Sequence, residues 1–251
     1  MTDHSVYIVS PVRDWDMYGR CLKDNPHTKD CHLIPLDNRE KNRAIPVLYN
    51  EVLDVLPEHA WAVFCHEDWM PMEDLYPRLE KLDKNGIYGP VGAFLEERTK
   101  ASFLHIRGSV LQCEKDGSQE RLFRGAELEG RVDCFDCQCL IVHASLVKRL
   151  GLRFDPRLAF DLYAEDFCAA AHVAGGVESQ AIRLKCRHYS RGTLTPRFDA
   201  GLQYLREKYA GAPKAYATTV GDHNTFGAPA KAPVYTVSWD FFTRLRYLLK
   251  R

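Results

Sequence analysis

The sequence predicts an α/β fold in which helices flank a mostly parallel sheet, with a smaller mixed part beside it. The first observation is that short apolar runs of strand length alternate with segments of helical periodicity in the early part of the chain. The second is that these runs end abruptly in polar residues or proline. A chain of 251 residues, 45% hydrophobic and 27% charged, can also bury a core large enough to carry a cleft.

The first half of the chain alternates between the two periodicities. An apolar run that begins at Val6 is ended by Pro11, which indicates a buried strand, and a helical pattern stops just before Pro57. The same reasoning predicts strands over 6–10, 32–36, 61–65 and 87–88, helices over 44–56 and 74–83, and a turn or loop over 89–92.

The second half is more mixed. Lys115-Asp116-Gly117 indicates a turn within a hairpin-like stretch over 102–129, and glycines at 151 and 175–176 mark helix ends. The expected elements are strands over 137–142 and 181–188, helices over 146–150, 165–174 and 202–209, a Gly/Pro-rich loop over 210–233, and a final helix over 238–251.

This pattern divides the chain into a main domain over 1–210 and a tail over 211–251. The last segment, Ser238–Arg251, is a basic amphipathic helix by its spacing of apolar and cationic residues. Docking on the core is the favoured interpretation, and peripheral contact with a membrane surface is the alternative.

Charge and cysteine content exclude several classes of protein. The 34 basic and 34 acidic residues give a net charge of zero, so no overall field favours nucleic acid as the partner. Nine cysteines cannot all pair, and their scatter through apolar stretches favours reduced thiols in a cytoplasmic protein. No signal peptide or membrane-spanning run is evident.

The cysteine cluster over 134–139 is not expected to bind zinc. Cys134, Cys137 and Cys139 lack a second pair of ligands for zinc, and Cys137 and Cys139 are expected to share one face of a core strand.

Three polar clusters remain as candidates for chemistry. His66-Glu67-Asp68 directly follows the strand over 61–65, where a divalent cation, Mn²⁺ or Mg²⁺, would compensate the carboxylates; a solvated turn is the equal alternative. Glu165 and Asp166 open a helix, which the helix dipole alone explains, although one of them could serve as a general base. His188 ends a late strand.

The order of these clusters resembles that of nucleotide-sugar glycosyltransferases of the GT-A fold. It is most similar to the glycosyltransferase-like family that includes the streptomycin-biosynthesis StrF-type domain. The resemblance covers roughly 5–195, and the matching stretches are Pro11-Val12-Arg13-Asp14, Leu36-Asp37-Asn38, Ile45 to Asn50, Val63 to Asp68, Ile87 to Gly92, Val132-Asp133 with Asp136, Phe154-Asp155, Tyr163 to Asp166, and Cys186 with His188 and Ser190.

The resemblance implies a role for each matching residue. His66-Glu67-Asp68 takes the place of the metal-binding acidic motif, with Asp68 as the direct ligand and His66 standing where the family has an aspartate. It implies that His188 contacts the metal or diphosphate, that Asp166 is the base, and that Glu165 caps the helix or orients the acceptor. The residues implied at the nucleotide sugar are Pro11, Val12, Arg13, Asp37, Asn38, Asn50, Glu67 and Asp136.

The function that follows is metal-dependent transfer of a sugar from a nucleotide-diphosphate sugar to a hydroxyl acceptor, with inversion. The acceptor would be a glycan, a lipid-linked molecule or a small molecule, in surface polysaccharide or secondary-metabolite biosynthesis. The alternatives are an inactive nucleotide-binding scaffold of the same fold and a nucleotidyltransferase, although the stretch after the first strand lacks the glycine-rich phosphate loop. A zinc hydrolase is the weakest, because no His-Glu-x-x-His pattern is present.

Overall fold

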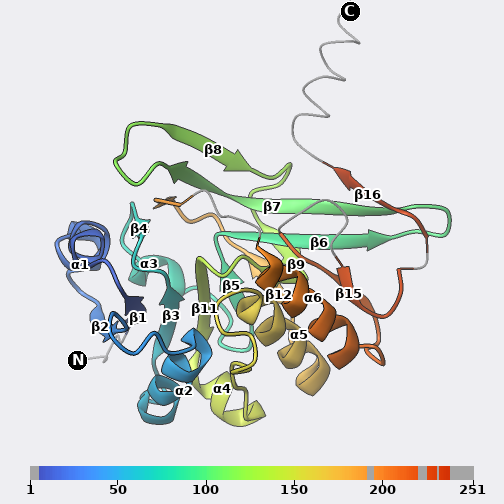
Figure 1. Cartoon of the computed structure of the whole chain (residues 1–251), viewed down its shortest axis with the longest axis horizontal. Helices are drawn as coiled ribbons and strands as arrows, with labels where there is room; N and C mark the ends of the chain where they lie inside the picture. Colours follow the sequence, from blue (N-terminus) through green and yellow to red (C-terminus); the bar gives the residue numbers. More distant parts are fainter. Residues whose placement is uncertain (1–5, 191–194, 220–224, 231, 238–251) are drawn as a thin grey trace, which may run out of the picture.

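The computed structural model describes residues 6–190, 195–219, 225–230 and 232–237. The predicted helix over 238–251, with its suggested membrane contact, lies outside the described residues. Two large β-sheets and a group of helices make up the fold (Figure 1). The predicted α/β class is therefore confirmed. No helix in the described part of the chain has the length and apolar character needed to cross a bilayer.

The first sheet carries the strands that reach the candidate site. Its order is β2 (His32–Asp37), β1 (Val6–Val12), β3 (Trp61–Cys65), β11 (Cys139–His143), β5 (Ile87–Gly89), β12 (Ser179–Ala181) and β9 (Gly130–Val132). β1 is parallel to both β2 and β3, so their carboxyl ends meet at one edge. β11 is antiparallel to β3 and β5, and β9 is antiparallel to β12. The sheet is thus mixed, which corrects the expectation of a mostly parallel one.

The second sheet lies across the end of the first. Its order is β10 (Cys134–Phe135), β6 (Val91–Glu97), β7 (Ser102–Cys113), β13 (Cys186–His188) and β4 (Trp69–Pro71), with β8 (Glu120–Arg124) and β16 (Val234–Val237) also paired to β7. β13 runs antiparallel to β4, with His188 opposite Trp69. This pairing brings a residue from late in the chain beside the turn that follows β3.

Helices cover one face of the first sheet and gather on one side of the molecule (Figure 1). The larger ones are α2 (Ile45–Val55), α4 (Ala144–Leu150), α5 (Tyr163–Gly175) and α6 (Pro196–Lys208). Residues of all four join one apolar cluster with the sheet. Gly151 and Gly176 end α4 and α5 in the left-handed conformation that glycine adopts without a side-chain clash.

The opposite face is covered by shorter elements. These are α1 (Trp15–Tyr18), a π-helical turn (Gly19–Lys23), a 3₁₀ turn (Pro26–Thr28) and α3 (Tyr76–Leu79). Residues of α1, the π-helical turn, α3 and β4 join a second apolar cluster with the sheet. α3 is a single turn, much shorter than the helix expected over 74–83, because the polar stretch after Leu79 leaves few residues to bury.

Three other expectations differ from the structure. The loop expected over 89–92 is the junction where β5 passes into β6, and the strand expected over 181–188 is divided between β12 and β13, which belong to different sheets. The loop expected over 210–233 contains the hairpin β14 (Ala215–Ala217) and β15 (Thr225–Gly227). Tyr216 and Phe226 of this hairpin pack in the main core, which gives these short strands an apolar face to bury.

Eight of the nine cysteines are buried and Cys31 is partly buried, and the described chain holds all nine as free thiols. Cys137 packs in the cluster beneath the helices, whereas Cys139 packs in the cluster on the opposite face of the sheet. The expectation that they share one face is wrong, because 136–138 is a turn in which Asp136 accepts from the backbone and side chain of Gln138. Strand alternation applies only from Cys139 onward.

A buried polar cluster joins α5 to α6. Lys208 Nζ lies 2.9 Å from Asp155 Oδ2 and 2.6 Å from Asp166 Oδ1, and both carboxylates are almost fully buried. Tyr209 also donates to Asp166, and Tyr204 donates to Asp155. Lys208 is therefore the cation that separates two buried acids.

Replacing Lys208 with methionine is expected to lower the free energy of unfolding by about 3 kcal/mol. Removing one partner of a buried ion pair costs about 3–5 kcal/mol, and the lower end applies because Lys208 is 27% exposed. Urea denaturation measures the change, with Lys148→Met on the exposed side of α4 as the control. Equal stabilities of the two variants would contradict this role for Lys208.

Candidate functional site

The turn between β3 and β4 places two polar side chains at the edge where β1, β2 and β3 end. His66 and Asp68 lie on this turn, and the backbone N–H of His66 donates to Gln138 O at 3.2 Å. The backbone N–H of Tyr189 donates to Asp68 O, which continues the pairing of β4 with β13. The fold therefore holds both sides of the turn with backbone hydrogen bonds.

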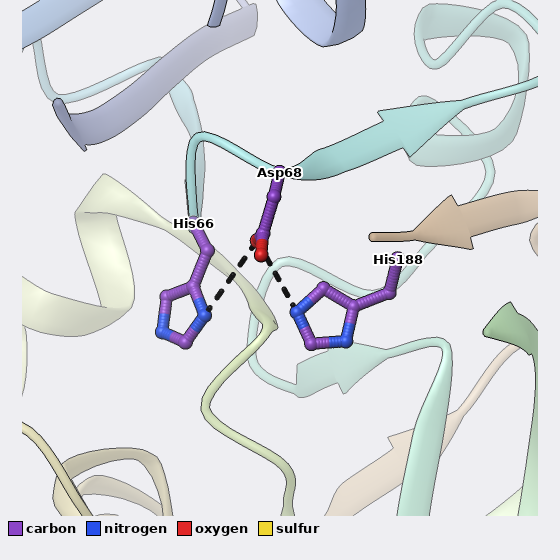
Figure 2. Close-up of side chains that lie close together, drawn as sticks. All are labelled: His66, Asp68 and His188. Carbon is purple, nitrogen blue, oxygen red and sulfur yellow. Dashed lines mark ion pairs between the residues drawn. The ribbon is translucent and has the colours of Figure 1, made fainter. Parts of the chain in front are cut away.

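His66, Asp68 and His188 converge to form the one cluster with metal-ligand character in the part of the chain that the structure describes. One ligand atom from each residue lies within 4.8 Å of the others. His188 Nε2 is 3.3 Å from Asp68 Oδ1, and His66 Nδ1 is 4.0 Å from the same oxygen (Figure 2). The three residues that the sequence suggested for a metal are thus brought together.

Several polar atoms of this cluster are buried without a hydrogen-bond partner among the described residues. They are Asp68 Oδ1 and both ring nitrogens of His188, because the short contact between the two side chains lacks hydrogen-bond geometry. An unpaired buried polar group costs about 1–3 kcal/mol, so such atoms call for a ligand. Two imidazole nitrogens and a carboxylate oxygen are donors that suit a divalent cation such as Mn²⁺.

The electrostatics of the cluster keep its carboxylate ionised. Burial alone would raise the pKa of Asp68, but the adjacent His188 imidazole, followed by His66, lowers it to about 2. The Asp68 carboxylate raises the pKa of His188 against the effect of burial. Burial lowers the pKa of His66, which favours its neutral form. A charged carboxylate and a neutral imidazole are the forms that bind metal ions, so a cation would have to displace the proton that the raised pKa of His188 favours.

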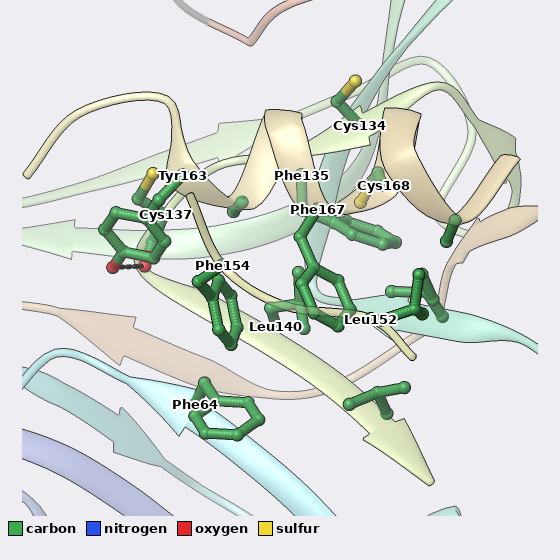
Figure 3. Close-up of a cluster of buried hydrophobic side chains, with 14 of the residues drawn as sticks. Phe64, Cys134, Phe135, Cys137, Leu140, Leu152, Phe154, Tyr163, Phe167 and Cys168 are labelled. Atoms are coloured by element: carbon green, nitrogen blue, oxygen red, sulfur yellow. Dashed lines mark hydrogen bonds between the residues drawn. The ribbon is translucent and has the colours of Figure 1, made fainter. Parts of the chain in front are cut away.

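Aromatic side chains surround His66. Its Nε2 lies 2.9 Å from the hydroxyl of Tyr163, which donates to Cys137 O at 2.8 Å, the contact drawn in Figure 3. The ring of Phe160 stacks on His66 with a centroid distance of 5.8 Å, and Phe160 is 44% exposed. Sequence reasoning gave Tyr163 and Phe160 no role, because only the fold brings them against the turn after β3.

The two acids that open α5 have different surroundings. Asp166 is directed away from the metal-ligand cluster, into the buried cluster with Lys208 and Tyr209. Glu165 lies against Cys137, whose Sγ is 3.4 Å from Glu165 Oε2. Burial, and then the nearby Asp136 carboxylate, raise the pKa of Glu165 to about 8. Cys137 also accepts through its carbonyl from Tyr163, which contacts His66, so Glu165 is the helix acid connected to the cluster.

The raised pKa of Glu165 predicts how stability changes with pH. Because the folded protein holds this proton more tightly than the unfolded chain, its stabilising effect is lost as pH rises from about 4.5 towards 8. As pH rises through this window, the free energy of unfolding of Glu165→Gln should therefore increase relative to that of wild type by up to about 1.4 kcal/mol per pH unit. Urea denaturation from pH 5 to 8 measures this, with exposed Glu58→Gln running parallel to wild type. If the difference in free energy of unfolding between Glu165→Gln and wild type stayed constant from pH 5 to 8, the raised pKa of Glu165 would be contradicted.

The residues suggested for the nucleotide sugar fall into two groups. Glu67 lies against the backbone amides of Arg13 and Asp14 at the end of β1, and Asp37 at the end of β2 is half exposed beside Arg39. Asn38 and Asn50 instead use both ends of their amides on backbone groups of Arg43 and Phe154.

Two further residues of that set, Pro11 and Val12, are buried in β1. Their side chains, like the amides of Asn38 and Asn50, are therefore occupied within the protein. Of the suggested residues, Arg13, Asp37 and Glu67 place polar side chains at the strand ends, and Asp136 acts electrostatically on His66.

Comparison with known proteins bears on the fold. No protein-family model matches the chain, and no curated protein matches it. Its structure is similar to that of GalNAc-T7 solved with UDP, GalNAc and Mn²⁺, with a TM-score of 0.50 and 8% identity over 82% of this chain and 48% of that one. Residues 1–349 of S. aureus TarS match with a TM-score of 0.48 and 10% identity, over 84% of this chain and 66% of that one.

GalNAc-T7 is a glycosyltransferase of the GT-A type, and at 8% identity the likeness shows the fold alone. The chain spans about half the length of the GalNAc-T7 chain. The GT-A-like fold predicted from the sequence is confirmed, whereas the closer relationship to the StrF-type family stays a prediction.

Proposed function

We propose that this protein is a glycosyltransferase that depends on a divalent cation and moves a sugar from a nucleotide-diphosphate sugar to a hydroxyl acceptor. The observation that carries the proposal is the cluster of His66, Asp68 and His188, whose buried polar atoms lack partners at the edge where three strands end. The GT-A-like fold supports it, since GalNAc-T7 shares this fold and was solved with UDP, GalNAc and Mn²⁺.

The same cluster would hold the cation. A bound cation would supply positive charge to neutralise the leaving diphosphate. We favour Mn²⁺ over Mg²⁺ because two of the three donors are imidazole nitrogens, and Mg²⁺ prefers oxygen ligands in octahedral geometry. The nucleotide would then lie towards Arg13, Asp37 and Glu67, at the ends of β1 and β3 and beside β2.

Glu165 is proposed as the base that removes the proton from the acceptor hydroxyl. Its raised pKa, about 8, lies close to the working pH of a general base. Asp166, the base implied by the resemblance, has one carboxylate oxygen bound to Lys208 and Tyr209 and the other buried. These contacts favour a structural role for Asp166. Inversion at the anomeric carbon is part of this proposal, since a single base and direct attack by the acceptor give that outcome.

Release of the nucleotide tests the proposed function directly. The protein is incubated with UDP-, GDP- and dTDP-sugars, with Mn²⁺ or with EDTA, and the liberated nucleoside diphosphate is measured. We expect release from one donor class, with Mn²⁺ only, and faster release when a hydroxyl acceptor is added. Nucleotide binding without release from any donor would instead indicate the inactive scaffold.

The acceptor and the cellular setting are proposals of a broader kind. A glycan, a lipid-linked molecule or a small molecule remains the proposed acceptor, in surface polysaccharide or secondary-metabolite biosynthesis in the cytoplasm. The division into domains 1–210 and 211–251 also stays a prediction, although the pairing of β16 with β7 and the packing of Phe226 tie parts of the tail to the main sheets.

A further inference from the structure

Tyr163 connects the candidate metal-ligand cluster to the helix that carries Glu165. It is fully buried at the start of α5, and its hydroxyl lies between His66 Nε2, at 2.9 Å, and Cys137 O, at 2.8 Å. Its ring packs among the aromatic side chains beneath the turn after β3 (Figure 3). The position of the hydroxyl is therefore set by the core and not by a mobile loop.

The direction of the two hydrogen bonds follows from the groups involved. A carbonyl oxygen only accepts, so the single proton of the Tyr163 hydroxyl is donated to Cys137 O. The hydroxyl oxygen is then left to accept from the other neighbour, and His66 Nε2 must carry the proton that it receives. In the neutral ring this assigns the lone pair to Nδ1, the atom nearer Asp68.

The backbone of His66 is held by the same turn as its ring. Its N–H donates to Gln138 O, while the ring reaches Cys137 O through Tyr163. The backbone bond holds the residue in the turn, and the contact with Tyr163 restricts rotation of the ring, so Nδ1 keeps facing Asp68 and His188 (Figure 2). Metal-binding histidines characteristically donate their second ring N–H to a fixed acceptor, which sets both tautomer and orientation.

We propose that Tyr163 is a positioning residue that fixes the ring of His66 in the Nε2–H tautomer and presents the Nδ1 lone pair to a divalent cation. This inference rests on the proposed function, because it assumes that His66 binds the cation. Loss of such an outer partner typically weakens metal affinity about 10- to 100-fold. Tyr163 itself touches neither the cation nor the substrate.

The first test measures Mn²⁺ affinity by isothermal titration calorimetry on the metal-free protein. Tyr163→Phe is expected to weaken binding about 10- to 100-fold. The matched control is Tyr216→Phe, which removes a buried hydroxyl lying 2.9 Å from the ring of His172, outside the cluster. Its Mn²⁺ affinity is expected to equal that of wild type. An unchanged affinity in Tyr163→Phe would overturn the proposal.

The second test needs no variant and no metal. Long-range ¹H–¹⁵N correlation spectra of the metal-free wild-type protein report which nitrogen of His66 carries the proton. We expect Nε2–H, and an Nδ1–H ring would overturn the proposal even if Tyr163→Phe failed to fold. If wild type bound no cation, the proposed function would fail, and the tautomer would still decide whether Tyr163 sets the ring of His66.

Discussion

Glu165→Gln is expected to lower the turnover number about 10²- to 10⁴-fold, the usual effect of removing a general base. Glutamine keeps the shape of the side chain but cannot accept the proton of the acceptor hydroxyl. The carboxyl is buried against Cys137 and raised in pKa to about 8, so its burial suits the neutral amide. Turnover should therefore fall while the variant remains folded and becomes relatively more stable at higher pH.

The pH dependence of kcat/KM is a second test of Glu165 as the general base. A base must be deprotonated to act, so kcat/KM of wild type should rise with pH as the Glu165 carboxyl titrates, around pH 8 in the protein without a cation. A cation held nearby would move this limb to lower pH by favouring the carboxylate. The limb should be absent from the residual activity of Glu165→Gln.

Asp166→Asn is the neighbouring control. Asp166 is held by Lys208 and Tyr209, so its replacement is expected to lower stability without an equal loss of turnover by the folded protein. Steady-state rates of both variants, normalised to the folded fraction, separate the two acids. A loss of about 10²-fold or more in Asp166→Asn together with near-normal turnover in Glu165→Gln would restore Asp166 as the base.

Asp68→Asn is expected to cost about 10³-fold in kcat/KM. A metal ion supplies several kcal/mol of charge stabilisation in the transition state, and each 1.36 kcal/mol corresponds to about tenfold in rate. The amide keeps an oxygen near His188 but loses the charge that binds the cation. The rate of nucleotide release at saturating Mn²⁺ measures the effect.

A surface aspartate provides the matched control for this substitution. Asp74 pairs with His27 at 2.8 Å, and both side chains are well exposed. Asp74→Asn removes the same charge from an Asp–His pair outside the candidate site, so its kcat/KM should equal that of wild type. Equal activities of Asp68→Asn and Asp74→Asn would mean that Asp68 does not hold a catalytic cation.

Local patterns in the sequence predicted much of the fold. β1, β3 and α2 follow from short apolar runs and helical spacing because each buries apolar residues along its length. β2 also follows from its apolar run, although its residues are only partly buried or exposed. β12 and β13 could not be separated in this way, since the choice of sheet depends on partners distant in sequence. The hairpin of β14 and β15 is stabilised by Tyr216 and Phe226 in the main core, which the Gly/Pro-rich composition does not indicate.

The sequence predicted the candidate metal ligands, but it did not predict the different surroundings of the two acids that open α5. His66 and Asp68 follow directly from their place after β3, and the order of motifs added His188. Glu165 and Asp166 are adjacent on a helix and so point about 100° apart, and only the fold shows that Asp166 meets Lys208 of α6 whereas Glu165 meets Cys137. Asn38 and Asn50 illustrate the same limit, because an amide that binds backbone looks, in sequence, like one that binds ligand.

The most direct test of the central claim is a thermal-shift titration of UDP, GDP and dTDP into the protein with Mn²⁺ and with EDTA. A ligand that binds only the folded state stabilises it by about 2.7 kcal/mol at a hundredfold excess over its Kd. We predict such a shift for one nucleotide, with Mn²⁺ only, and its loss in Asp68→Asn. A shift of equal size in EDTA, or none with any nucleotide, would contradict a cation-dependent nucleotide-sugar site at His66, Asp68 and His188.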